Sequence, residues 1–256
     1  MSFQKDFIWC VGGAAAQQDG GYLNGGKGLN IWDALSEGHI KNNDTCHVAC
    51  DHFHRWKEDL GLLKELGVNS YRFSVSLARI YPKDEYIVNE EGVKFYIDLV
   101  AELRRLGIEP ICTLYHWDMP LWLHERGGWK NPIAVEWFER FTKTVVEAIS
   151  DKVQYWLTFN EPQIFVGHGY QIGEHAPFEK LSQKEIQAIS RNVMLAHGRA
   201  VRTIRKYAKT LPKVGFASTC DMLLPVDGDE EKAYRATFDC TRNGVYNPAW
   251  WCDPML

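Results

Sequence analysis

The stretch LTFNEP, residues 157 to 162, closes an apolar, β-favouring run with an amide, a carboxylate and a proline. A residue that precedes proline is disfavoured in the right-handed helical region, and proline has no N–H to donate to a sheet. We therefore predict that a buried strand ends here. We also predict that Glu161 stands on extended backbone rather than at the start of a helix.

The segments around this stretch alternate between strand-like and helix-like patterns. Short apolar runs predict strands, and apolar residues at helical spacing predict helices. Strands that alternate with helices in this way predict a parallel sheet. The predicted strands are 7–13, 68–75, 108–117, 153–159 and 213–219, and the predicted helices are 56–67, 91–107, 131–150, 183–209 and 229–244.

The long segments 14–51 and 161–182 follow the first and fourth predicted strands. Loops at the carboxyl ends of strands carry the site in a (β/α)₈ barrel, whereas a doubly wound open sheet is the competing architecture. A barrel needs eight units and the sequence supplies five, and the final NPAWWCDPML lacks a polar tail. We expect an α/β fold of the TIM-barrel type, incomplete, with about the first five βα units in a single domain over 1–256.

Composition narrows the class of protein. The 256 residues carry a net charge of -4 with both signs interspersed, so no basic face predicts nucleic-acid binding. No run approaches the length of a membrane span, and the start, MSFQKDFIWC, does not resemble a signal peptide. Seven scattered cysteines fit reduced thiols. We expect a cytoplasmic protein without nucleic-acid or membrane partners.

Two motifs resemble cofactor sites but lack essential parts. GYLNGGK, residues 21–27, has phosphate-loop spacing but is followed by Gly28 instead of Ser or Thr, and it does not join a strand directly to a helix. The run DTCHVACDHFH contains potential zinc ligands that do not form two clean pairs. These potential ligands are Cys46, His47, Cys50, His52 and His54. We expect no metal and no cofactor, and we expect Asp51 to cap a helix there.

Polar side chains mark the ends of neighbouring predicted strands. His116 ends the third strand in YHWDMP, Asn160 and Glu161 end the fourth, and Gln17 follows the first. The second strand carries Arg72, a charge that is costly in a barrel strand unless a carboxylate meets it. Taken alone, His116 would be interpreted as a packed histidine. Together these five side chains predict one rim, and neutral donors and acceptors around a carboxylate suit a sugar.

The sequence resembles glycoside hydrolase family 1, the retaining β-glucosidases and their relatives. The resemblance covers essentially the whole chain from Phe7 onward, and YHWDMP followed by WLTFNEP at this spacing is its most specific part. The other matching stretches are FIWCVGGAAAQQDGG, GKGLNIWDAL, ACDHFHRWKEDLGLLKELGVNSYRFSV, TLYHWDMPLWL, GGWKNP and GYQIGEHAP. Asp19, where a Glu is usual, and Gln18, where an aliphatic residue is usual, depart from the family pattern.

This resemblance implies a role for each residue of the predicted rim. Glu161 matches the catalytic acid/base, and Asn160 would bond the sugar 2-hydroxyl. Gln17 and His116 would hold hydroxyls on the far side of the same ring. Arg72 would orient the nucleophile. The substrate implied is a β-glycoside or an oligosaccharide.

The nucleophile implied by the resemblance is a second Glu in a T-E-N-G motif, which does not occur in these 256 residues. Retaining hydrolysis needs both carboxylates, roughly 5 Å apart. We expect hydrolysis of terminal β-D-glycosidic bonds by the full gene product, and an inactive, poorly soluble isolated chain that a C-terminal half of the barrel could complement. The alternatives are an inactive, truncated sugar-binding paralogue or fragment and the 6-phospho-β-glucosidase branch, of which Trp117 in YHWDMP is less typical.

Overall fold

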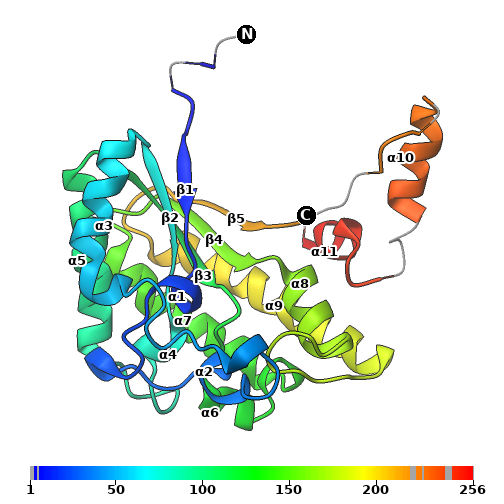
Figure 1. Ribbon diagram of the computed structural model, residues 1–256, viewed down its shortest axis with the longest axis horizontal. Coiled ribbons are helices and arrows are strands. Elements are labelled where there is room, and N and C mark those ends of the chain that lie inside the picture. Colours follow the sequence, from blue (N-terminus) through cyan, green and yellow to red (C-terminus); the bar gives the residue numbers. More distant parts are fainter. Residues whose placement is uncertain (1–2, 5, 220–222, 227, 240–243, 256) are drawn as a thin grey trace.

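The computed structural model describes residues 3–4, 6–219, 223–226, 228–239 and 244–255 of the chain. Its centre is a parallel sheet whose five strands lie in sequence order, each strand paired with the one before it (Figure 1). The strands are β1 (Cys10–Gly12), β2 (Ser70–Ser74), β3 (Glu109–Tyr115), β4 (Tyr155–Asn160) and β5 (Lys213–Ala217). All five predicted strands are present. Most of the predicted ranges extend a few residues beyond the observed strand at one end or both.

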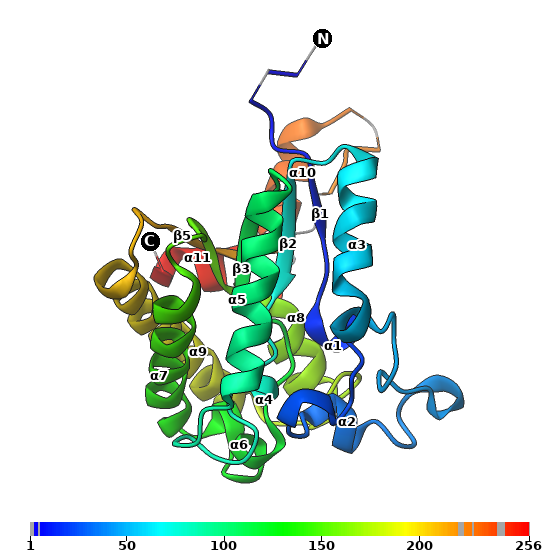
Figure 2. The same ribbon diagram turned by 90° about the vertical axis from the view of Figure 1, so that its left-hand side faces the viewer.

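Four long helices cover one face of the sheet. They are α3 (His52–Leu66), α5 (Glu90–Arg105), α7 (Ile133–Ile149) and α9 (Gln183–Tyr207). Figure 2 shows them side by side in chain order in front of the strands. A doubly wound sheet would carry helices on both faces, so this one-sided layer of helices fits the barrel arrangement and not the open-sheet alternative.

Local sequence signals explain where these helices begin and end. Ser182 caps α9 through its side chain, and Glu185 returns the bond to the Ser182 backbone. Gly67 ends α3 in the left-handed conformation, which glycine adopts without steric cost. The helices pack their apolar stripes on the sheet, where Phe138, Phe141 and Trp156 are fully buried. This packing fixes the strand ends that carry the site.

Short helices that the sequence did not predict fill the segments after the strands. These segments contain α1 (Ala15–Gln18), α2 (Ile31–Leu35), α4 (Leu77–Ile80), α6 (Leu121–Glu125), α8 (Pro162–Val166) and the π-helix η4 (Gly167–Gln171). One or two turns are too short to show a helical period in the sequence. Figures 1 and 2 show α1, α2, α4 and α6 gathered at the carboxyl end of the sheet.

The last described elements are α10 (Glu230–Asp239) and α11 (Pro248–Met255). The predicted helix 229–244 is confirmed as far as residue 239, and residues 240–243 lie outside the described part of the chain. The unpredicted α11 packs against α8 and α9. Its Trp251 is fully buried and donates an indole hydrogen bond to the Val245 carbonyl, at 2.7 Å. In contrast, α10 stands apart from the sheet and its helices (Figure 1).

The sheet is open at both sides. Within the described residues, β1 pairs only with β2, and β5 pairs only with β4. This is the arrangement expected for the first five strands of an eight-stranded barrel. Across the described residues, every helix is too short or too polar to cross a membrane.

Candidate active site

The strand register brings the predicted rim residues together. Tyr115 lies opposite Phe159 in the β3–β4 pair, so the residues that follow them, His116 and Asn160, lie at the same level at the carboxyl end of the sheet. Glu161 comes next, and its N–H still donates to the Ala217 carbonyl of β5, at 2.7 Å. Two adjacent strands thus deliver an imidazole, an amide and a carboxylate to one edge of the sheet.

Glu161 does not have the extended backbone that the sequence predicted. Its φ and ψ are 44° and 67°, in the left-handed region, and it occupies the N-cap position of α8 with Pro162 as the first helical residue. Its carbonyl accepts hydrogen bonds from the N–H groups of Ile164 and Phe165. Pro162 does exclude the right-handed conformation at Glu161. However, proline also suits the first turn of a helix, so the chain turns sharply instead of continuing straight.

Arg72 on β2 reaches across the sheet to the end of β4. Its Nη2 donates to the amide oxygen of Asn160 at 2.5 Å, and its Nε donates to Oγ1 of Thr113 at 2.9 Å. The predicted carboxylate neighbour is Glu161, whose charge opposes the fall in the Arg72 pKa that burial causes. Arg72 is therefore held by an amide and a hydroxyl, with the carboxylate nearby.

Trp117 connects the end of β3 to the end of β4 by a hydrogen bond. Its indole N–H donates to the backbone carbonyl of Asn160 at 2.8 Å. Its own carbonyl accepts from the indole N–H of Trp32, at 3.1 Å. Trp117 has φ of 73°, which is rare for a bulky residue and costs free energy. The two hydrogen bonds compensate for this conformation and connect the first loop with β4.

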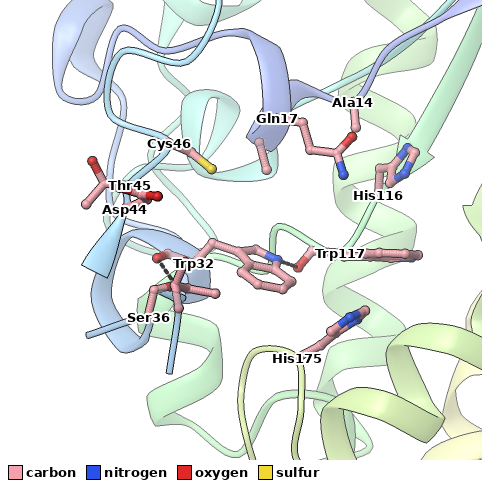
Figure 3. A pocket seen from close by; sticks show the side chains of 12 residues that line it. Ala14, Gln17, Trp32, Ser36, Asp44, Thr45, Cys46, His116, Trp117 and His175 are labelled. Carbon is pink, nitrogen blue, oxygen red and sulfur yellow. Dashed lines mark hydrogen bonds between the residues drawn. The ribbon is translucent and has the colours of Figure 1, made fainter. Parts of the chain in front are cut away.

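A pocket of about 240 Å³ lies beside these residues (Figure 3). Gln17 and His116 lie close together at one end, and Cys46, Thr45 and Asp44 lie at the other, with Trp32 between them. The complete lining is Ala14, Ala16, Gln17, Trp32, Ser36, Ile40, Asp44, Thr45, Cys46, His116, Trp117 and His175. Flat aromatic walls with a few polar groups are typical of sites for small ligands.

His116 is a neutral group in this pocket. Burial, and to a smaller extent the positive charge of Arg72, together lower its pKa from 6.5 to about 3. Its Nδ1 is buried and forms no hydrogen bond within the described part of the chain. A neutral imidazole can donate from one nitrogen and accept at the other, so His116 can contact a hydroxyl without carrying charge.

The five predicted residues therefore form a continuous group. Gln17 and His116 share the pocket, and the charge of Arg72 acts on both His116 and Glu161. The amide of Asn160 is joined to Arg72 by a hydrogen bond. Sequence reasoning missed Trp32, His175 and Cys46 as pocket residues. All three lie in the segments after β1 and β4. Trp32 and His175 stand within stretches that match the family pattern, and Cys46 stands in the run of potential zinc ligands.

The region around the two rejected motifs forms a set of ion pairs. Lys27 pairs with Asp33 at 2.5 Å, and His52 pairs with Asp59 at 2.6 Å. Asp51 does not cap α3 as predicted: it occupies the N-cap position in the left-handed conformation, and its carboxylate bonds to His54 instead. In the part of the chain that the structure describes, no three His, Cys, Asp or Glu side chains converge in a group that could hold a metal ion. Cys10, Cys46, Cys50 and Cys112 are thiols, and Cys220 and Cys240 lie outside the described residues.

Comparison with known proteins identifies the family of the chain. The family model described as Glycosyl hydrolase family 1 matches residues 1–256. The chain belongs to this family. It is 37% identical to β-glucosidase A of Acetivibrio thermocellus over 100% of the chain and 56% of that relative.

Solved structures give the same result. A β-glucosidase from Exiguobacterium marinum superposes with a TM-score of 0.89 at 35% identity, covering 99% of this chain and 56% of that one. A β-glucosidase from Thermotoga maritima in complex with deoxynojirimycin superposes at 0.88 and 36% identity, covering 96% and 55%. The chain thus spans about half the length of these family 1 relatives. The predicted α/β fold, an incomplete TIM barrel of about five βα units, is confirmed.

Proposed function

We propose that the chain contributes the acid/base half of a β-glucosidase that hydrolyses terminal β-D-glycosidic bonds with retention. The observation that carries this proposal is the position of Glu161 at the end of β4, beside the Arg72–Asn160 hydrogen bond. The β-glucosidase relatives support the same reaction. The nucleophilic Glu lies outside these 256 residues, because they contain no T-E-N-G motif.

In this mechanism Glu161 protonates the glycosidic oxygen as the leaving group departs. The nucleophile meanwhile attacks the anomeric carbon and forms a glycosyl-enzyme. Glu161 then accepts a proton from the water that cleaves this intermediate. The tight turn at Glu161 supports this role, because hydrogen bonds on both sides fix the backbone from which the carboxylate projects.

The neighbouring side chains suit the recognition of sugar hydroxyls. The amide oxygen of Asn160 is occupied by Arg72, which leaves its NH₂ group to donate to a 2-hydroxyl. Gln17 and the neutral His116 would contact hydroxyls elsewhere on the same ring. Arg72 would orient the nucleophile once that carboxylate is present, since its cation stands next to Glu161.

The proposed partners are a β-glycoside or oligosaccharide substrate and a C-terminal half of the barrel that would pair with the open edges of β1 and β5. No cofactor is required for this chemistry. We propose a cytoplasmic location, because the scattered cysteines suit a reducing compartment.

The test combines this chain with the C-terminal half of the Thermotoga maritima β-glucosidase by co-expression. We expect turnover of p-nitrophenyl β-D-glucoside by the combination and no turnover by either half alone. Glu161→Gln in the combination should lower kcat/KM far more for alkyl glucosides than for 2,4-dinitrophenyl glucoside, whose leaving group needs no proton. Turnover of both should still slow, because hydrolysis of the glycosyl-enzyme loses its base. Equal losses on both substrates would contradict an acid/base role for Glu161.

A second candidate is sugar binding without catalysis, which the absence of the T-E-N-G motif favours for the chain by itself. Calorimetric titration of the isolated chain with deoxynojirimycin distinguishes the two. Binding to the chain alone, together with no turnover by the combination, would favour the second candidate. A parallel assay with p-nitrophenyl 6-phospho-β-D-glucoside tests the phosphorylated branch, for which we expect the lower rate.

A further inference from the structure

Asp33 and Asp118, which follow the pocket residues Trp32 and Trp117 in the chain, belong to a buried charge cluster that also contains Asp19, Lys27 and Arg79. Asp19 and Lys27 are 5% and 8% exposed, Arg79 and Asp118 are 0% exposed, and the Asp33 side chain is 6% exposed. These residues come from different elements: the end of α1, the loop that follows it, α2, α4 and the turn after β3. The cluster therefore joins several segments that carry the pocket.

The buried charge cluster contains more acids than bases. Lys27 and Arg79 are its two cations, and Asp19, Asp33 and Asp118 are its three aspartates. The adjacent His52 does not supply the missing cation, because its Nδ1 is paired with Asp59 at 2.6 Å. An isolated ionised carboxylate in such an enclosed site costs several kcal/mol. One of the three aspartates should therefore carry a proton.

Two of the aspartates have a cation beside them. Asp33 binds Lys27 at 2.5 Å and accepts the N–H of Asn30 at 3.0 Å. Asp19 faces Arg79, whose positive charge is the strongest influence that favours its ionised form. Arg79 itself stacks on the ring of Phe53, at 3.9 Å.

Asp118 has no such partner. Both of its carboxyl oxygens are buried, and within the described residues only the Ser76 hydroxyl and its own backbone N–H approach them, without the geometry of a full hydrogen bond. The groups that face it are Lys27, which already binds Asp33, together with Asp19, the Ser76 hydroxyl, Tyr96 and Tyr115. Of the three aspartates, Asp118 is the one whose only neighbouring cation is already paired with another carboxylate.

We infer that Asp118 is a positioning residue, buried as a neutral acid, that holds the strained Trp117 turn in place. Trp117 adopts its φ of 73° directly before Asp118 and bonds to the Asn160 carbonyl. On the other side, the Met119 carbonyl accepts the Ile31 N–H at 2.9 Å. The Ser76 hydroxyl is the group that a neutral Asp118 can bond, and the Ser76 N–H in turn donates to the Tyr96 hydroxyl at 2.7 Å. This contact can anchor the turn between the Trp117 and Met119 hydrogen bonds. The catalytic meaning of this position rests on the proposed function, but its protonation does not.

The electrostatics agree with this inference. Burial raises the pKa of Asp118 well above 3.8, and burial raises that of Asp19 to about 6. The folded chain then holds protons that the unfolded chain releases above pH 3.8, so stability falls as pH rises toward the folded pKa values. Above about pH 6, Asp19 no longer contributes to this slope, and Asp118 remains.

The first experiment compares Asp118→Asn with Asp33→Asn by urea unfolding between pH 6 and pH 8. Asparagine mimics the neutral acid and needs no proton to fold, so Asp118→Asn should be at least as stable as the wild type at pH 6. Relative to this variant, the unfolding equilibrium constant of the wild type should rise with pH, by up to about tenfold per unit. Asp33→Asn leaves Lys27 unpaired and should raise the constant by a hundredfold or more at every pH. Strong destabilisation by Asp118→Asn at pH 6, or a wild-type ratio that does not change with pH, would overturn the inference.

The second experiment reports on position directly. The indole N–H of Trp117 donates to Asn160, so its NMR resonance, assigned by Trp117→Phe, should stay in place in Asp118→Asn and move in Asp118→Ala. Identical spectra for both variants would mean that Asp118 does not hold the Trp117 turn in place.

A third experiment, infrared spectroscopy of the wild type, needs no variant. A protonated carboxyl band that persists at pH 8 supports the inference, and its absence refutes it.

Discussion

The amide oxygen of Asn160 accepts a hydrogen bond from Nη2 of Arg72 across the width of β3. This bond fixes which end of the Asn160 amide faces the pocket side, because only the NH₂ group remains to donate. The residue that precedes Glu161 is thereby oriented by a side chain from two strands away.

Replacing Arg72 with Met should destabilise the chain, because the Asn160 oxygen would remain buried without a donor. We expect the free energy of unfolding to fall by about 1–3 kcal/mol, measured by urea denaturation. Arg72→Lys keeps the charge but not the two-pronged geometry, so its loss should be smaller. An unchanged stability in Arg72→Met would mean that this hydrogen bond contributes nothing.

Glu161 should be a position where glycine is better tolerated than alanine. Its φ of 44° is strained for any residue with a Cβ atom, so Glu161→Gly should be about 1 kcal/mol more stable than Glu161→Ala. Glu136 on the exposed side of α7 is the matched control, where glycine should be the less stable by about 1 kcal/mol. If glycine and alanine ranked in the same order of stability at both positions, the backbone of Glu161 would not be strained.

His116 should make the chain less stable as pH falls. The unfolded chain binds a proton near pH 6.5, whereas the folded chain does not until about pH 3. Stability therefore decreases below pH 6.5, by up to about 1.4 kcal/mol per pH unit. His116→Gln removes this contribution. We would measure the difference in the free energy of unfolding between the two proteins by urea denaturation from pH 7 to pH 4.5. Taking the difference cancels the opposite pH dependence that Asp19 and Asp118 cause in both proteins. A difference that does not change with pH would refute the predicted contribution of His116.

The free edge of β5 should cause self-association. The Lys213 N–H donates to the Gln154 carbonyl, directly before β4. Hydrogen bonding alternates along a strand, so the N–H of Val214 points to the open side. Val214→Pro should reduce association, as measured by sedimentation at increasing concentration, with little loss of stability. Gly215→Pro breaks the β4–β5 ladder and should unfold the edge instead. Association that survives Val214→Pro would have to arise elsewhere.

Much of the fold and the candidate site could be predicted from the sequence. Apolar runs and helical periods are strong signals in long elements such as α7 and α9, and polar residues at strand ends predicted the positions of His116 and Asn160. The failures have physical reasons. Short helices such as α8 have no period to detect, and the backbone of Glu161 depends on Pro162 serving as a helix start, which requires the tertiary turn to be known. Asp51 failed as a cap because it binds His54.

The strictly sequential strand order has a consequence for how the chain is made. Each strand pairs with the one synthesised before it, so every strand that emerges from the ribosome finds its template already present. Folding can then proceed in the direction of synthesis, one strand and one helix at a time. At every stage the growing sheet has a single new edge, and that edge is where the nascent protein most needs protection.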